Sequence, residues 1–118
     1  FPGDAQWENW SYALDQSKKH YERIEALLSD VDLLKVGHHG SLNATPKSMW
    51  ALLKKKGAAS KRGRLKSMLS TLPGKHGGKH GAKTEVPRRT LVTELKAKSE
   101  FRTTETEALY ATHEIALT

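Results

Sequence analysis

One apolar run of six residues constrains the fold of this chain more than any other feature. The run VDLLKV, residues 31–36, lies between Asp30 and Gly37 and is rich in branched side chains. A short apolar run with such boundaries is typical of a strand that is buried on both faces. Helix-like sequence precedes it, and a helix that leads into a buried strand predicts a layered α/β arrangement.

The helical pattern before the strand is clear in the spacing of its apolar residues. Trp7, Trp10 and Leu14 recur at intervals of three and four, and residues 21–28 repeat the pattern. This predicts a helix with a break near Ser17. Both tryptophans lie on the apolar stripe, so we expect them in the core.

A second helix should follow the strand, because the sequence marks both of its ends. Thr45 is a capping residue, Pro46 suits the first turn, and Gly57 suits the left-handed conformation that closes a helix. Trp50 falls on the apolar stripe of this segment and is also expected in the core.

Further strands and one helix complete the alternation. Residues 65–71 predict a strand, and residues 86–99 predict a helix with Pro87 near its start. Residues 100–118 alternate threonine with apolar residues as two terminal strands would, with His113 at an exposed position. The order predicts a single α/β domain over residues 1–118, with helices covering a sheet.

Composition limits the chemistry and the surroundings of the chain. The 118 residues include no cysteine, so a metal could be held only by histidine and carboxylate side chains. The lack of cysteine is also consistent with a reducing compartment. No apolar run approaches the length of a membrane span, and the first residues lack the layout of a signal peptide. We therefore expect a cytoplasmic location and no membrane contact from this segment.

The basic residues are concentrated in the middle of the chain. Residues 47–89 contain thirteen of the twenty lysines and arginines and one of the thirteen acidic residues. Such a segment could attract the phosphates of a nucleic acid or an anionic substrate. It could equally be a solvated loop whose lysines serve solubility.

A possible metal site lies where the strands end. Asp4 follows FPG, which reads as the exit of a strand, and His38 and His39 follow the apolar run directly. Parallel strands bring their carboxyl ends to the same edge of a sheet, where α/β folds place their ligands. Histidine and aspartate at such ends can bind a metal and leave a coordination position open. The same residues could instead cap a turn and line a polar loop.

A Gly, Lys and His tract forms the other histidine-bearing feature. The tetrapeptide GKHG occurs at residues 74–77 and again at residues 78–81, which places His76 and His80 four residues apart. The glycines argue against the helix that a metal pair at this spacing needs, so we expect a loop. Contact with a substrate is the alternative role for both histidines.

These segments together resemble the C-terminal half of a metallo-β-lactamase-fold hydrolase. The similarity rests on GDA, DLLKVGHHGS followed by a threonine and a helix, LKSMLST, the histidine-containing loop before VPRRTLVTEL, and FRTTETEALYATHEIAL. The most similar branch includes the hydrolase-like domain of bacterial competence proteins for DNA uptake. The resemblance extends over essentially the whole chain.

The resemblance implies an αββα sandwich whose edge holds two divalent metal ions, zinc or alternatively manganese. Asp4 matches the aspartate that bridges the two ions, and one histidine of the pair matches the last ligand. We favour His39 as the ligand and His38 as a substrate contact, although the sequence leaves this open. Ser41 would orient a histidine or a substrate oxygen. Phosphodiester or related ester bonds are the expected substrates, with acyl and lactam bonds as alternatives.

The chain departs from this family in one important respect. The main ligand motif of the family, His-x-His-x-Asp-His, does not occur in it. We therefore expect the chain alone to be inactive, and we expect the N-terminal half of the domain or a second chain, which could be another copy, to complete the site. Two other hypotheses are a non-catalytic basic module that binds nucleic acid and a degenerate half-domain with a structural role.

Overall fold

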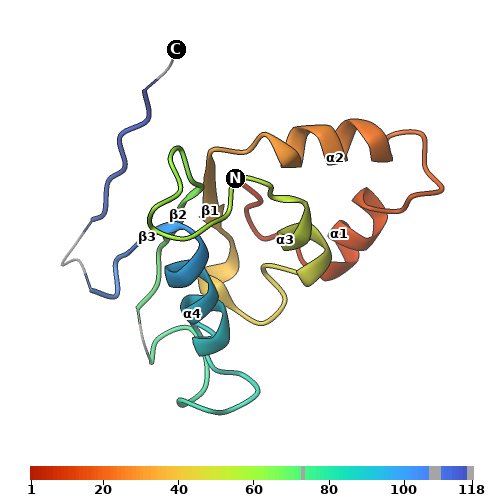
Figure 1. The fold of residues 1–118 in the computed structure, drawn as a ribbon. Coiled ribbons are helices and arrows are strands. Elements are labelled where there is room, and N and C mark those ends of the chain that lie inside the picture. Colours follow the sequence, from red (N-terminus) through yellow and green to blue (C-terminus); the bar gives the residue numbers. More distant parts are fainter. Residues whose placement is uncertain (73, 107–109, 117–118) are drawn as a thin grey trace.

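The computed structural model describes residues 1–72, 74–106 and 110–116, which form an α/β fold around a parallel sheet (Figure 1). The strands are β1 (Leu33–Val36), β2 (Lys66–Leu69) and β3 (Glu100–Thr103), in the order β1-β2-β3. Both pairs are parallel, which requires a crossover connection after each strand. Helices α3 (Lys47–Leu52) and α4 (Arg89–Lys98) lie in these two crossovers. The α/β class and the alternation expected from the sequence are confirmed.

The two crossover helices cover the same face of the sheet. Leu34 and Val36 of β1 alternate with the half-buried Leu33 and Lys35, so one face of the strand is turned toward the helices. The resulting core is small and continuous. Its buried apolar members are Leu34, Val36, Met49, Leu53, Leu65, Leu69, Val92 and Leu95.

Helices α1 (Trp7–Ala13) and α2 (Tyr21–Ser29) flank this core, with the expected break between them. Trp10 packs against the core from α1, as the sequence predicted. Trp7 does not, because it lies at the first residue of α1, and its side chain is 53% exposed. The expectation that Trp7 is a core residue is therefore wrong.

Helix α3 is shorter than the sequence pattern suggested. Pro46 is its N-cap, and the Thr45 hydroxyl is buried with no hydrogen-bond partner among the described residues, so Thr45 does not cap the helix. Leu53 leaves the helix in an extended conformation and is buried in the core. Gly57 accordingly lies beyond the helix end, where its N–H donates to the carbonyl of Lys98 at 2.8 Å.

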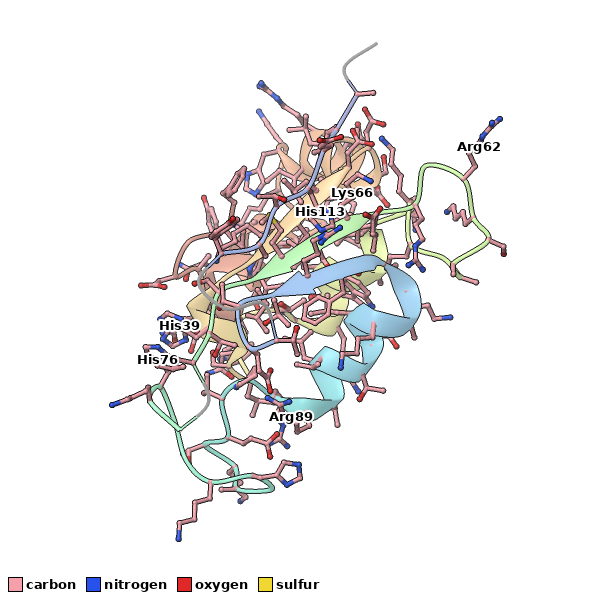
Figure 2. The ribbon with its side chains drawn as sticks, turned by 90° about the vertical axis from the view of Figure 1, so that its left-hand side faces the viewer. His39, Arg62, Lys66, His76, Arg89 and His113 are labelled. Carbon is pink, nitrogen blue, oxygen red and sulfur yellow. The ribbon has the colours of Figure 1, made fainter. Side chains whose placement is uncertain are left out.

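The C-terminal segment crosses the face of the sheet that the helices leave uncovered (Figure 2). Residues 110–116 contain no strand, and the remainder of the second expected strand, 107–109 and 117–118, lies outside the described residues. The His113 side chain is only 1% exposed, so its predicted exposure is wrong. Its Nε2–H donates to the Ser67 carbonyl at 3.1 Å, and its Nδ1 lies 3.5 Å from Glu100 Oε1. These contacts hold the segment against the sheet.

None of the helices in the described part of the chain is long and apolar enough to cross a membrane.

Candidate functional site

The two adjacent histidines form a left-handed turn at the carboxyl end of β1. His38, His39 and Gly40 have φ angles of 45°, 53° and 77°, and we call these three residues the His turn. The N–H of Gly40 donates to the carbonyl of Gly37 at 2.9 Å, which closes the turn. A left-handed backbone costs a residue with a Cβ roughly 1–2 kcal/mol. Both histidines therefore occupy a conformation that other contacts must enforce.

Close backbone contacts on both sides enforce this conformation. A Cβ at Gly37 would lie 2.2 Å from the carbonyl oxygen of Gly3, so only glycine permits the N-terminal segment to pass there. A Cβ at Gly40 would lie 3.1 Å from Pro87. The N–H of Arg88 also donates to the carbonyl of Gly40 at 2.8 Å. The His turn is thus clamped between the first residues of the chain and the segment that leads into α4.

His39 has a defined tautomer in its neutral form. Its Nδ1 lies 2.9 Å from the carbonyl oxygen of Ser70, just after β2. Since a carbonyl can only accept, Nδ1 must carry the hydrogen, and the lone pair lies on Nε2. Metal-binding histidines commonly donate their second ring N–H to a backbone carbonyl in this way. The arrangement therefore suits His39 as a ligand through Nε2.

His76 lies directly against His39 (Figure 2). The two rings stack with their centroids 3.8 Å apart and an angle of 5° between their planes. Parallel stacked rings direct their nitrogens outward in their own planes, so the stack itself does not chelate one ion. It does bring the first GKHG tetrapeptide to the edge where β1 and β2 end.

His38 is exposed and bonded to Ser41. Its Nδ1 lies 2.8 Å from Ser41 Oγ. A hydroxyl can donate or accept, so this contact orients the ring without fixing its tautomer. Ser41 was expected to orient a histidine or a substrate oxygen, and in the structure its hydroxyl contacts His38.

Asp4 lies in an exposed turn beside the His turn. The contact of Gly3 with Gly37 brings the backbone before Asp4 next to the residue that precedes His38. Among the residues that the structure describes, the Asp4 carboxylate has no hydrogen-bond or ion-pair partner. The structure thus places Asp4, His38, His39, Ser41 and His76 around one edge of the sheet.

His80 belongs to a different part of the loop, near Glu85. No described contact connects it to the His turn. The Glu85 carboxylate is buried and accepts hydrogen bonds from the N–H of Gly81 and, at 2.8 Å, from the N–H of Arg89. These bonds lower the pKa of Glu85, and the bond from Gly81 has the largest effect. Burial acts in the opposite direction and raises the pKa. Glu85 thereby ties the loop that carries both GKHG tetrapeptides to the start of α4.

We predict an acid-dependent stability that comes from Glu85. The pKa of Glu85 is lower in the folded chain than its ordinary value of 4.5. The ionised carboxylate therefore stabilises the fold fully above pH 4.5, and this stabilisation is lost as the pH falls through the pKa of the folded state. Glu85→Gln should be less stable than the native chain at pH 7, and the difference should shrink steadily below pH 4.5. Urea unfolding followed by circular dichroism over this range measures it. Glu22→Gln, which removes an exposed carboxylate from α2, is the control, and an equal loss in both variants would contradict the prediction.

The described residues do not form a complete metal site. No group of three or more histidine, aspartate or glutamate side chains lies close enough to bind an ion within residues 1–72, 74–106 and 110–116. What fits a metal is the orientation of His39, whose Nδ1–H donates to the Ser70 carbonyl so that Nε2 is available. These residues could therefore supply only part of a dinuclear site.

Much of the basic segment is occupied by internal contacts. Lys55 Nζ lies 2.8 Å from both Asp30 Oδ1 and Asp32 Oδ1. Lys61 donates to two carbonyls of the loop that follows α3. Arg62 extends into solvent (Figure 2). These lysines stabilise the loop between α3 and β2, which reduces the charge available for nucleic acid.

Neither the left-handed turn nor the bond from His39 to Ser70 was predicted from the sequence. The glycines on either side of the histidines indicated a tight bend, and this was the available signal. Comparisons with protein-family models, with curated proteins and with solved structures find no match to this chain.

Proposed function

We propose that this chain supplies part of the dinuclear metal site of a hydrolase that cleaves phosphodiester or related ester bonds. The observation that carries the proposal is the His turn. Two consecutive histidines are held in a left-handed conformation, and the Nδ1 of His39 is engaged so that its Nε2 is available. Strained backbone of this kind persists where surrounding contacts enforce it, and it is concentrated at functional sites.

The proposed roles follow from the positions of the side chains. His39 would bind one ion through Nε2, the Asp4 carboxylate would bridge two ions, and His38 with Ser41 would contact the substrate. His76 and His80 would be further substrate contacts from the loop. When bound, two zinc or manganese ions would lower the pKa of a water molecule and neutralise charge on the phosphate. The remaining ligands would come from residues outside these 118.

The one-sided layering of the fold supports this proposal. The face of the sheet opposite α3 and α4 is crossed by residues 110–116 and has no helix over it among the described residues. In an αββα sandwich a second sheet covers this face. Lys66 and Glu100 lie on that face and form an ion pair at 2.8 Å. Because the two charges of this ion pair cancel, a second sheet packed on this face would bury less net charge.

Metal content and hydrolysis provide the test. The protein isolated from its native source should contain about two equivalents of zinc or manganese. It should hydrolyse bis(p-nitrophenyl) phosphate, and a chelator should stop the reaction. Absence of bound metal, or hydrolysis that survives the chelator, would contradict the proposal.

The same preparation separates the hydrolase from a basic nucleic-acid-binding module. Binding of a DNA oligonucleotide through lysines should weaken steeply as salt rises and should be unaffected by the chelator. Salt-sensitive binding without hydrolysis would favour that module. Full function after Asp4→Ala would instead favour a structural half-domain.

A further inference from the structure

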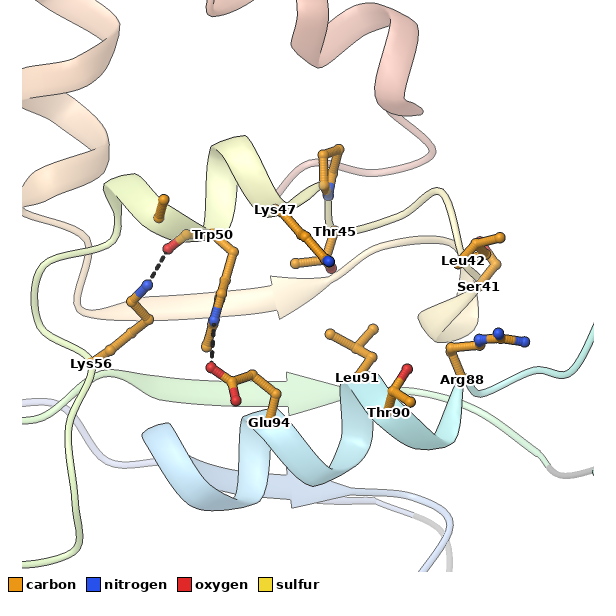
Figure 3. Close-up of a pocket in the computed structure, with 12 residues that line it drawn as sticks. Ser41, Leu42, Thr45, Lys47, Trp50, Lys56, Arg88, Thr90, Leu91 and Glu94 are labelled. Carbon is orange, nitrogen blue, oxygen red and sulfur yellow. Dashed lines mark hydrogen bonds between the residues drawn. The ribbon is translucent and has the colours of Figure 1, made fainter. Parts of the chain in front are cut away.

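A cavity of about 600 Å³ opens between α3 and α4, on the helix-covered side of the sheet (Figure 3). Trp50 lines it from α3, and Leu91 and Glu94 line it from α4. Ser41 lies at one end and is the same residue that bonds to His38. Ser41 is therefore shared between the cavity and the surroundings of the His turn, whereas no residue of the His turn itself lines the cavity.

Positive charge exceeds negative charge around the cavity. Three of its lining side chains are cationic, namely Lys47, Lys56 and Arg88, and one is anionic, Glu94. Burial lowers the pKa of the Lys56 ammonium, and the nearby Glu94 carboxylate opposes this shift. The excess of positive over negative charge around the cavity favours the binding of an anion.

The cations retain free hydrogen-bond donors. Lys47 has no partner in the part of the chain that the structure describes. Arg88 donates from Nη1 to the carbonyl of Ala82 at 3.0 Å, and its guanidinium points away from Lys47 (Figure 3). Lys47 could therefore bind an oxyanion with no loss of an existing ion pair.

The middle of the cavity suits a flat apolar body. The Trp50 side chain is fixed there, because its Nε1–H donates to Glu94 Oε1 at 3.0 Å. Lys56 also lies over its ring, with Nζ 4.7 Å from the centroid. Leu91 provides apolar surface on the α4 side (Figure 3). A ring system that enters the cavity would thus meet a rigid aromatic and aliphatic wall.

From these observations we infer that the cavity between α3 and α4 binds a small organic anion with an aromatic body and an oxyanion group. Lys47 binds the oxyanion, and the wall formed by Trp50 and Leu91 holds the ring. This site does not depend on the proposed metal chemistry, because none of these side chains is a proposed ligand.

The test uses 1-naphthyl phosphate as the probe, with the full chain in the presence of a chelator. The NMR signal of the Trp50 indole N–H should shift on titration, while the indole signals of Trp7 and Trp10 remain in place. Uncharged 1-naphthol and inorganic phosphate should each bind at least about tenfold more weakly, since each lacks one of the two recognised groups.

A matched pair of charge reversals locates the binding site. Lys47→Glu should raise the dissociation constant at least about tenfold, because it removes a cation from the cavity and adds an anion. Lys96→Glu makes the same change of charge at an exposed position of α4 that does not line the cavity, and it should change the constant less than about twofold. No shift of the Trp50 signal, equal binding of 1-naphthol, or equal effects of the two variants would overturn the inference. Because the chelator is present throughout, the result is independent of hydrolysis.

Discussion

Replacement of His39 by alanine, in the protein that carries the complete proposed site, should lower the affinity for zinc at least about tenfold, which corresponds to about 1.4 kcal/mol. The reason is geometric. His39 Nδ1–H donates to the Ser70 carbonyl, so the ring presents Nε2 in a fixed direction, and the variant removes this nitrogen. Competition with a chromophoric zinc indicator measures the change. The same titration on His38→Ala should give a smaller loss if His39 is the ligand, and a larger loss would reverse the two assignments.

Two further variants make this experiment decisive. His80→Ala removes a histidine from an exposed loop position outside the His turn and should change zinc affinity less than about twofold. In His39→Asn the new residue tolerates the left-handed backbone. A lower zinc affinity of this variant therefore cannot be attributed to a change in the turn conformation. If His80→Ala and His39→Ala weaken zinc equally, the ion binds nonspecifically, and the proposed role of His39 fails.

The parts of the fold that were predicted correctly have local causes. The strand β1 was predicted because a run of apolar residues with polar ends has few other stable conformations, and α4 was predicted because Val92 and Leu95 repeat at helical spacing. The predicted end of α3 was wrong because the burial of Leu53 in the core outweighs the local sequence signals for helix termination. The prediction that His113 is exposed was wrong for a related reason, since its burial depends on a contact with Ser67, 46 residues earlier in the chain.

In the candidate site, too, the features set by local sequence were predicted and those set by contacts between distant segments were not. The sequence placed the two histidines after a strand, and the structure confirms that position. It could not show that His39 stacks on His76 or bonds to Ser70, because those contacts connect segments that are distant along the chain. The left-handed conformation itself depends on contacts of Gly37 with Gly3 and of Gly40 with Pro87, which no local pattern encodes.

Gly40→Ala should be the most destabilising single change at the His turn, with an expected loss of about 2–4 kcal/mol in the free energy of unfolding. Two effects add in this variant. Alanine is strained at a φ of 77°, and its Cβ would meet Pro87 at 3.1 Å and Leu69 at 3.2 Å in the packed core. The chain must therefore shift the segment before α4 or the side chain of Leu69, and either shift disturbs the clamp on both histidines.

Gly63→Ala separates the two effects, because Gly63 has a similar φ of 61° and nothing within 4 Å of the added Cβ. This control should lose only about 1 kcal/mol, the backbone cost alone. Urea unfolding followed by tryptophan fluorescence measures both variants. If Gly40→Ala loses no more than Gly63→Ala, the contact with Pro87 and Leu69 does not enforce the turn. If Gly40→Ala is more destabilising and also weakens zinc binding while Gly63→Ala does not, the enforced backbone conformation and the orientation of His39 depend on the same contact.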